Sequence, residues 1–370
     1  MAKKIRFTAW SFLKNLIGIP VLFSLLLAYL SPVLHPDTAW IIPFFGLLYP
    51  IILIIGIIYT VIASLKRSRW ALIIGGLLIL GISFHLRLVA FGATPSPEDV
   101  QPIKFMSYNV HLFDRYGGSI DSSNKNRIKM ISYIHQESPD IMCFQEFYQQ
   151  DRPTTFSTRD TLLRLFPGFF HHEHYLYKKA GHQNFGVTIL SRYPMIEKGN
   201  VIFDQDTHSS NYCIYTDIVR DLDTIRVYNV HLQSVKLGND YALFDENQNT
   251  TEKRTWLRVI NKLNKAYPIR ADQAIRITEH IEQSPYPVVV CGDFNDTPMS
   301  YTYSEFSSIL TDSFLECGSG IGVTYAGNVP AGRIDYIFHS PELGSGDFNI
   351  QDEAISDHYA IFSKIFVKNE

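Results

Sequence analysis

Hydrophobic positions follow two different patterns along this 370-residue chain. Before residue 92 they form three long apolar runs, at about residues 16–34, 40–65 and 71–91. Each run approaches the ~20 residues that a helix needs to cross a bilayer. A cleaved signal peptide accounts for the first run only, and a buried helical bundle is disfavoured by three such runs in succession. The pattern therefore predicts a membrane region at residues 1–92 with three transmembrane helices and a lipid bilayer as partner.

Basic residues near these runs predict how the membrane region is oriented. Four Lys and Arg residues precede the first run, and three more lie at residues 66–69, between the second and third runs. The connection at residues 35–39 has none. Because loops rich in Lys and Arg next to membrane spans stay on the cytoplasmic side, the N-terminus is predicted to be cytoplasmic. Three crossings then place the rest of the chain on the extracytoplasmic side, periplasmic or external.

A different pattern begins after a polar, proline-rich linker at residues 93–102. Short β-branched and aromatic runs bounded by turn residues predict strands at 103–110, 140–146, 185–191, 225–232, 286–293, 333–338 and 359–367. Apolar residues at helical spacing predict helices at 126–137 and 271–283. Strands outnumber helices, so residues 103–370 are expected to form an α/β domain with sheets at its centre.

The interval at residues 233–269 separates two of these strands by an unusual length. Its first part is polar and is predicted to be a loop, whereas residues 252–267 carry one apolar face with basic residues elsewhere. An amphipathic helix that covers the core is the favoured interpretation. A surface that touches lipid head groups or phosphates is the alternative.

Charge separates the same two regions. The whole chain has a net charge of −3, and 8 of its 33 Lys and Arg but only 3 of its 36 Asp and Glu precede residue 103, so residues 103–370 carry −8. This disfavours broad capture of nucleic acid, which needs a basic face, although a local basic patch is left open. The four cysteines lack the spacing of a metal site and identify no disulfide pair: Cys143, Cys213, Cys291 and Cys317.

Polar residues that can bind metal or move protons follow several of the predicted strands. They are Asn109, Glu146, His231, Asp293 with Asn295, Asp335, and Asp357 with His358. Taken singly, most read as turn formers or structural residues. A buried strand that ends in carboxylates is costly unless something meets them, however, and the coincidence at so many strand ends indicates one shared site.

The segments SYNV, QE, GVTILSR, NVHL, GDFNDTP, RIDYIF and SDH give these residues a family context. In this order they resemble the endonuclease/exonuclease/phosphatase superfamily, over about residues 103–368. The resemblance implies a four-layer α/β sandwich, with two central, mainly antiparallel sheets flanked by helices and a site at one edge. The expected fold is thus this sandwich preceded by three transmembrane helices.

The same resemblance implies a catalytic set. Asp293 would orient and deprotonate the attacking water, and Asn295 would form hydrogen bonds in the same region. His358 would donate to a phosphate oxygen, with Asp335 holding it in one tautomer. His231 would contact the phosphate or assist the leaving group.

The resemblance further implies a metal ion and substrate contacts. Asn109, Glu146 and Asp357 would hold Mg²⁺, with Mn²⁺ as the other candidate, through the oxygen ligands that hard cations prefer. Asn184 and Arg333 would contact the substrate.

Other suggestive residues are interpreted as structural. Residues 171–174 read His-His-Glu-His, but neighbours in an extended segment point to opposite faces, which disfavours a zinc site. Asp296 is interpreted as the cap of its turn, and Tyr301 and Tyr303 as packing residues.

These observations together predict a membrane-anchored, Mg²⁺-dependent phosphoesterase. The expected substrate is a phosphate ester, most consistently a phosphodiester of a phospholipid, nucleotide or nucleic acid. The first alternative is an extracytoplasmic scavenging endonuclease or exonuclease. The second is a catalytically inactive, membrane-anchored binding protein, which would be expected to have lost Glu146, Asp293 or His358.

Overall fold

A computed structural model describes the chain except for residues 1–8, 93–94, 97–99, 117–119, 152–155, 180–181, 204–210, 236–251, 328–331 and 369–370. The first part of the 233–269 interval lies largely outside the described residues. The chain divides into two compact units. A helical unit comprises residues 1–88 and 297–304, and a sandwich unit comprises residues 89–296 and 305–370.

The helical unit contains three longer helices and two short ones. They are α1 (Ala9–Leu30), α2 (Ile42–Leu47), α3 (Tyr49–Leu65), α4 (Arg69–Leu80) and α5 (Ile82–His85). Leu25, Tyr49 and Ile74 form the centre of its small apolar core, together with Met299 from the 297–304 segment. The Ser68 side chain accepts a hydrogen bond from the backbone of Trp70 and so caps the start of α4.

The predicted membrane spans are the main correction to the sequence analysis. Within the part of the chain that the structure describes, no helix is both long and apolar enough to cross a membrane. The run at 40–65 is divided at Leu48, between α2 and α3, and the run at 71–91 is divided at Gly81, between α4 and α5. The three predicted transmembrane helices are therefore not supported.

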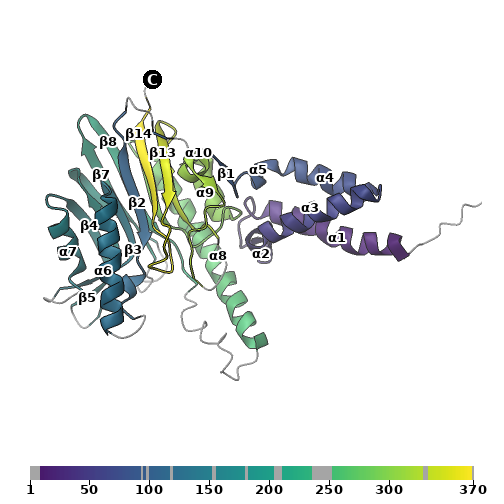
Figure 1. Ribbon diagram of the computed structural model, residues 1–370, viewed down its shortest axis with the longest axis horizontal. Coiled ribbons are helices and arrows are strands. Elements are labelled where there is room, and N and C mark those ends of the chain that lie inside the picture. The colour runs from purple at the N-terminus through teal and green to yellow at the C-terminus, as the bar shows by residue number, and fades with distance from the viewer. Residues whose placement is uncertain are drawn as a thin grey trace, which may run out of the picture. The chain divides into compact units, whose positions relative to one another are not determined.

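The sandwich unit is built on two six-stranded sheets (Figure 1). In spatial order, the first sheet contains β13 (Leu343–Ile350), β14 (Ile361–Val367), β2 (Ile103–Asn109), β3 (Ile141–Gln150), β5 (Gln183–Ser191) and β4 (Phe170–Lys179). The second contains β10 (Thr311–Asp312), β12 (Asp335–His339), β9 (Val288–Asp293), β8 (Asp223–His231), β7 (Tyr212–Arg220) and β6 (Met195–Val201). A separate two-stranded sheet pairs β1 (Ala90–Phe91) with β11 (Ser319–Gly320).

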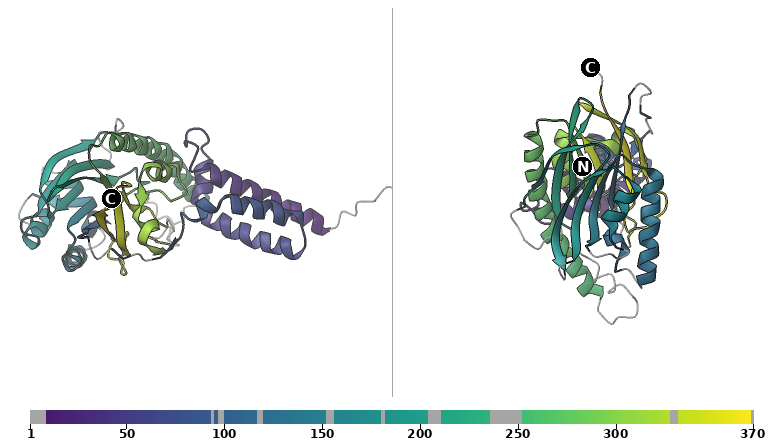
Figure 2. Two further views of the ribbon diagram at one scale, coloured as in Figure 1. Left: turned by 90° about the horizontal axis from the view of Figure 1, so that it is seen from above. Right: turned by 90° about the vertical axis from the view of Figure 1, so that its left-hand side faces the viewer.

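Helices cover the outer faces of both large sheets. On the first sheet lie α6 (Ile120–Glu137) and α7 (Thr158–Leu165), and near the second lie α8 (Glu252–Glu282) and α9 (Tyr301–Ile309) (Figures 1 and 2). The short α10 (Ser313–Cys317) contributes Phe314 and Cys317 to the core between the sheets. The order helices, sheet, sheet, helices confirms the predicted sandwich. Helix α8 runs on through Pro268, so the two helical segments predicted at 252–267 and 271–283 form one helix.

Burial on both faces explains why the strand sequences are almost continuously apolar. Phe105 of β2 belongs to the main core between the two sheets, whereas Met106 faces the second core beneath α6. Such strands lack the apolar–polar alternation of a half-exposed sheet. The described cysteines Cys143, Cys213, Cys291 and Cys317 are all buried and free.

Two parallel strand pairs determine where the functional groups meet. β2 pairs with β3 and β8 pairs with β9 in parallel, while the other pairings within the two large sheets are antiparallel. The carboxyl ends of these four strands therefore lie at one edge of the sandwich. Gly292 permits the close approach of β8 to β9 there, because a Cβ at this position would lie 2.0 Å from the Val230 carbonyl oxygen.

Candidate active site

Asp293 is the central residue of the predicted site. It ends β9 and pairs in register with His231 of β8 on one side and with Asp335 of β12 on the other. Its side chain is 1% exposed. A buried carboxylate at this position needs hydrogen-bond donors or cations around it, and the neighbouring strand ends supply them.

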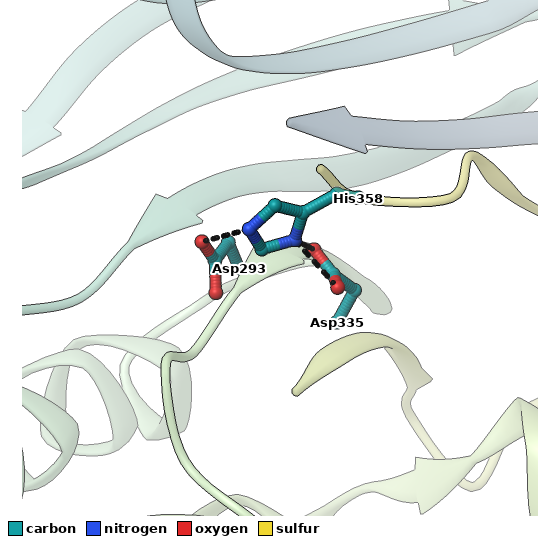
Figure 3. Close-up of side chains that lie close together, drawn as sticks. All are labelled: Asp293, Asp335 and His358. Carbon is teal, nitrogen blue, oxygen red and sulfur yellow. Dashed lines mark hydrogen bonds and ion pairs between the residues drawn. The ribbon is translucent and has the colours of Figure 1, made fainter. Parts of the chain in front are cut away.

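Asp335, His358 and Asp293 form a linear arrangement (Figure 3). His358 Nδ1 lies 3.0 and 3.1 Å from the two Asp335 carboxylate oxygens, while His358 Nε2 lies 3.7 Å from Asp293 Oδ2. Thr324 Oγ1 accepts hydrogen bonds from the backbone N–H groups of Ile334 and Asp335, which fixes the start of β12. The imidazole is thus held by Asp335 and directs its other nitrogen toward Asp293.

Electrostatics in this arrangement favour a charged imidazole. Burial lowers the pKa of His358, but the carboxylates of Asp335 and Asp293 outweigh it and raise that pKa to about 10. Burial raises the pKa of Asp335 to about 6, with the imidazolium of His358 opposing it. At neutral pH the pair is therefore an imidazolium beside a carboxylate, and Nε2–H is available as a donor.

Asn109 connects the two sheets at the site. Its Nδ2 donates to Asp293 Oδ2 over 2.9 Å, and its Oδ1 accepts from the backbone N–H of His111 over 3.1 Å. The other Asp293 oxygen, Oδ1, accepts from the backbone N–H of Asn295 over 2.8 Å. The two oxygens of Asp293 are thus oriented by two neighbours, Asn109 at the end of β2 and the backbone of the turn that follows β9.

His231 is a buried histidine near the carboxylates of Asp293 and Glu146. Its side chain is 1% exposed, and within the described residues neither ring nitrogen has a hydrogen-bond partner. Nε2 lies 3.8 Å from Asp293 Oδ2 and 3.9 Å from Glu146 Oε1, which is too far for a hydrogen bond to either. A buried imidazole without hydrogen-bond partners requires an explanation. Binding of a water, cation or phosphate oxygen by His231, Asp293 and Glu146 would provide one.

Backbone strain accompanies these side chains. Glu146 sits at a bulge between β3 and β5 with φ of 49°, and Asn295 has φ of 54°. Both are in the left-handed region, which costs a non-glycine residue about 1–2 kcal/mol. The bulge interrupts the alternation of β3, so that Glu146 points toward His231. Strain of this kind is concentrated at functional sites.

Asp357 and a histidine missed in the sequence analysis lie next to Asn109. Ser356 Oγ donates to the Asn109 carbonyl over 3.0 Å and to Asp357 Oδ1 over 3.2 Å, which ties the two segments together. His111 Nδ1 lies 3.9 Å from the same Asp357 oxygen, on a half-exposed side chain. The signal for His111 was its place directly after a strand that ends in a functional residue, in SYNVH.

The remaining predicted residues have mainly structural contacts. Asn295 Nδ2 donates to the Leu232 carbonyl over 3.1 Å, and Asn184 Nδ2 donates to Asp151 Oδ1 over 2.8 Å. Arg333 is buried, forms an ion pair with Asp312 and stacks on the Phe314 ring. The substrate contacts of Asn184 and Arg333 stay predictions.

The donor set fits a divalent cation that prefers oxygen. Ligand atoms of Asp293, Asp335 and His358 lie within 4.8 Å of one another, so this buried group could hold a metal ion. It overlaps the predicted catalytic set, whereas the predicted ligands are Asn109, Glu146 and Asp357. We favour the predicted ligands, because Nδ1 of His358 is already held by the Asp335 carboxylate and a hard cation prefers the oxygen donors of Asn109, Glu146 and Asp357.

The histidine-rich segment in β4 has ordinary structural contacts. His172 Nε2 lies 3.1 Å from the Gly199 carbonyl oxygen, and the His174 ring stacks on Tyr212 with centroids 4.0 Å apart. These two histidines therefore contact different neighbours.

Comparisons with known proteins agree with this geometry. The Endonuclease/Exonuclease/phosphatase family matches residues 106–358, and a domain of unknown function matches residues 11–88. No curated protein sequence matches the chain.

Solved structures with the same fold include three useful examples. A Bacteroides vulgatus endonuclease/exonuclease/phosphatase is 15% identical with a TM-score of 0.52, covering 72% of this chain and 100% of its own. A Leptotrichia buccalis family protein is 17% identical with a TM-score of 0.51, covering 71% and 99%. TDP2 from D. rerio, in complex with a single-strand DNA product, is 16% identical with a TM-score of 0.50, covering 72% and 100%.

Identities this low indicate the fold alone, so the assignment rests on the family match. That match covers more than half of the chain and contains every predicted catalytic and metal-binding residue. The chain belongs to the endonuclease/exonuclease/phosphatase family.

Proposed function

We propose that this protein is a Mg²⁺-dependent phosphoesterase whose substrate is a phosphodiester of a phospholipid, nucleotide or nucleic acid. Membership of the family supports hydrolysis of phosphate esters in general. The observation that carries the proposal is the convergence on Asp293 of an amide donor from Asn109 and two imidazoles, from His231 and His358. A carboxylate beside two imidazoles suits in-line attack of water on phosphorus.

Asp293 is proposed to act on the attacking water. Asn109 and the backbone of Asn295 fix the orientation of its carboxylate, and the side chain is excluded from bulk solvent. A water held between Asp293 Oδ2 and His231 would give its proton to the carboxylate as its oxygen attacks phosphorus. Placing water and base in this geometry before the reaction removes much of the entropic cost of attack.

His358 is proposed to stabilise the negative charge that develops on the phosphoryl group. Its Nδ1–H is committed to Asp335, which leaves Nε2–H free to donate to a nonbridging phosphate oxygen. The raised pKa keeps this nitrogen protonated through neutral pH. His231, which is buried and without a hydrogen-bond partner among the described residues, would contact a second phosphate oxygen or the leaving group.

Glu146, Asn109 and Asp357 are proposed to hold the metal ion. When bound, Mg²⁺ would supply Lewis-acid stabilisation of charge on the phosphoryl oxygens. Glu146 is suited to binding a cation because its side chain is partly exposed, at 29%, and its strained backbone keeps it directed at the site. Ser356 holds Asp357 beside Asn109.

A substrate panel tests the proposed activity. The full-length protein is assayed with a phospholipid, a dinucleotide, a single-stranded oligonucleotide, supercoiled plasmid and a phosphomonoester, each with Mg²⁺ and with EDTA. We expect hydrolysis of at least one phosphodiester that EDTA abolishes and added Mg²⁺ restores. Plasmid nicking in preference to the other substrates would favour the scavenging nuclease. Hydrolysis of none would favour the inactive binding protein and contradict the proposal.

We also propose that the helical unit associates with a lipid bilayer. Large apolar side chains are exposed along α3 and α4, among them Ile54, Ile58, Leu65, Leu72 and Leu80. Exposed large apolar side chains in such number favour a protein or membrane contact, and the basic residues at 66–69 could meet acidic head groups.

Membrane fractionation tests this association. We expect the full-length protein to sediment with membranes and to resist extraction by high salt, with release only by detergent. Full recovery in the salt-washed supernatant would contradict the proposal.

The extracytoplasmic position of the sandwich unit, proposed from the basic residues, is tested by adding protease to intact cells. Digestion of the sandwich unit supports this position, and protection contradicts it.

A further inference from the structure

Arg270 is the largest fully buried side chain in the described part of the chain, and the mechanism above gives it no role. It lies on α8 with 1% of its surface exposed. Its Nε donates to the Gln233 carbonyl over 2.7 Å, and its Nη1 lies 3.4 Å from Asp296 Oδ2. Burying a guanidinium is costly, so its partners should identify what it does.

Both partners adjoin catalytic segments. Gln233 follows His231 by two residues at the end of β8, and Asp296 follows Asn295 directly after β9. One turn further along α8, Gln273 Oε1 accepts from the Gln233 backbone N–H over 2.9 Å. Helix α8 therefore holds both polar backbone groups of Gln233: Gln273 accepts from its N–H, and Arg270 donates to its C=O.

The two segments are also connected directly to each other. The Leu232 backbone N–H donates to the Asp293 carbonyl over 3.0 Å, and Asn295 Nδ2 donates to the Leu232 carbonyl over 3.1 Å. Arg270 thus closes a ring of hydrogen bonds and one ion pair that contains the strand end bearing His231 and the turn bearing Asp293. Arg270 contacts both segments from α8, outside the sheet.

Stability alone is a poor reason for an arginine at this position. Its Nη2 has no hydrogen-bond partner among the described residues, so the buried charge is incompletely satisfied. Buried ion pairs are often replaced by apolar side chains without loss of stability. Arg226 provides a contrast: its Nε and Nη2 donate to Asp217, 2.7 and 2.8 Å away on the neighbouring strand β7.

We propose that Arg270, paired with Asp296, is a positioning residue that fixes the separation of His231 from Asp293. It does not touch the substrate, because it is buried behind both segments. Asp296, interpreted from the sequence as a turn cap, shares this positioning role as the ion-pair partner of Arg270. This inference rests on the proposed function for its kinetic consequences, but its structural consequence does not depend on activity.

Kinetics of full-length variants test the kinetic consequence. For Arg270→Met we expect kcat to fall about 10²-fold with KM changed less than about 3-fold, because small misplacements of catalytic groups cost about this much. Asp296→Asn should behave alike, the double variant should lose no more than either single one, and Arg270→Lys should recover part of the loss. Arg226→Met, the matched control, should keep kcat. Equal kcat losses in Arg270→Met and Arg226→Met would overturn the proposal.

Histidine ring NMR signals test the structural consequence without any substrate. The His231 signals, assigned by comparison with His231→Gln, should shift in Arg270→Met and Asp296→Asn but not in Arg226→Met. Unshifted signals in Arg270→Met would overturn the proposal even if activity fell. If the wild type hydrolyses no phosphate ester, the proposed function fails, while the NMR result still decides the role of Arg270.

Discussion

Substitution of Asp293 by Asn should lower kcat for phosphate-ester hydrolysis by about 10²- to 10⁴-fold, the contribution expected of a general base. The amide has nearly the same shape as the carboxylate but cannot take a proton from water. It can keep one carbonyl oxygen facing the backbone N–H of Asn295, so the turn should be retained. Its amide nitrogen would then face Asn109 Nδ2, a second donor, so the melting temperature should fall modestly while the main loss appears in kcat.

The same substitution at another buried carboxylate provides the control. Asp217 is 2% exposed and lies on β7, where it accepts a hydrogen bond from Arg226 of β8, the strand that ends in His231. Asp217→Asn should lower the melting temperature, because it weakens a buried ion pair, while leaving kcat within about threefold of the wild type. If Asp293→Asn retained wild-type kcat, the assignment of Asp293 as the base would be wrong.

Substitution of His358 by Gln should lower kcat by about 10²- to 10³-fold, which is the typical cost of removing one donor to a developing oxyanion. Glutamine can still donate a hydrogen bond but carries no positive charge. A stopped assay at saturating substrate measures this loss, and His339→Gln provides a comparison at a buried histidine paired with Glu316 outside the proposed site.

Asp335→Asn should change the pH dependence in a defined direction. In the wild type, the pKa of His358 is raised to about 10, so the imidazolium is lost only as pH rises through that value. Removing the Asp335 carboxylate removes a large part of this effect, so the basic limb of the pH–kcat profile should move to lower pH. The profile is measured at saturating Mg²⁺. An unchanged basic limb would contradict the role given to this pair.

The sequence indicated that the strand-end side chains lie close together, but it did not indicate the breaks in the helices before residue 89. Side chains at strand ends could be found because parallel neighbours such as β8 and β9 bring their carboxyl ends to one edge, whatever the details of packing. The direction of Glu146 could not be found, because it depends on a bulge between β3 and β5. The tie between Arg270 and Gln233 depends on how α8 packs, which the pattern of apolar residues does not specify.

Missed strands and broken helices have separate physical causes. β13, LGSGDFNI, is an edge strand with two glycines and an aspartate, so it lacks the β-branched run by which strands are identified. At Leu48 and Gly81 the backbone leaves the helical conformation inside an apolar run. The average hydrophobicity of the run does not reveal such breaks. The apolar length of these runs predicted membrane-spanning helices, but apolar length carries no information on whether a helix is continuous.

A crystal structure of the full-length protein grown with Mn²⁺ and inorganic phosphate would decide whether these residues act together. We expect an anomalous-scattering peak at Glu146 and Asn109, and a phosphate ion in contact with His231 Nε2 and His358 Nε2. Metal and phosphate bound away from Asp293, or an empty site at saturating concentrations of both, would contradict the account.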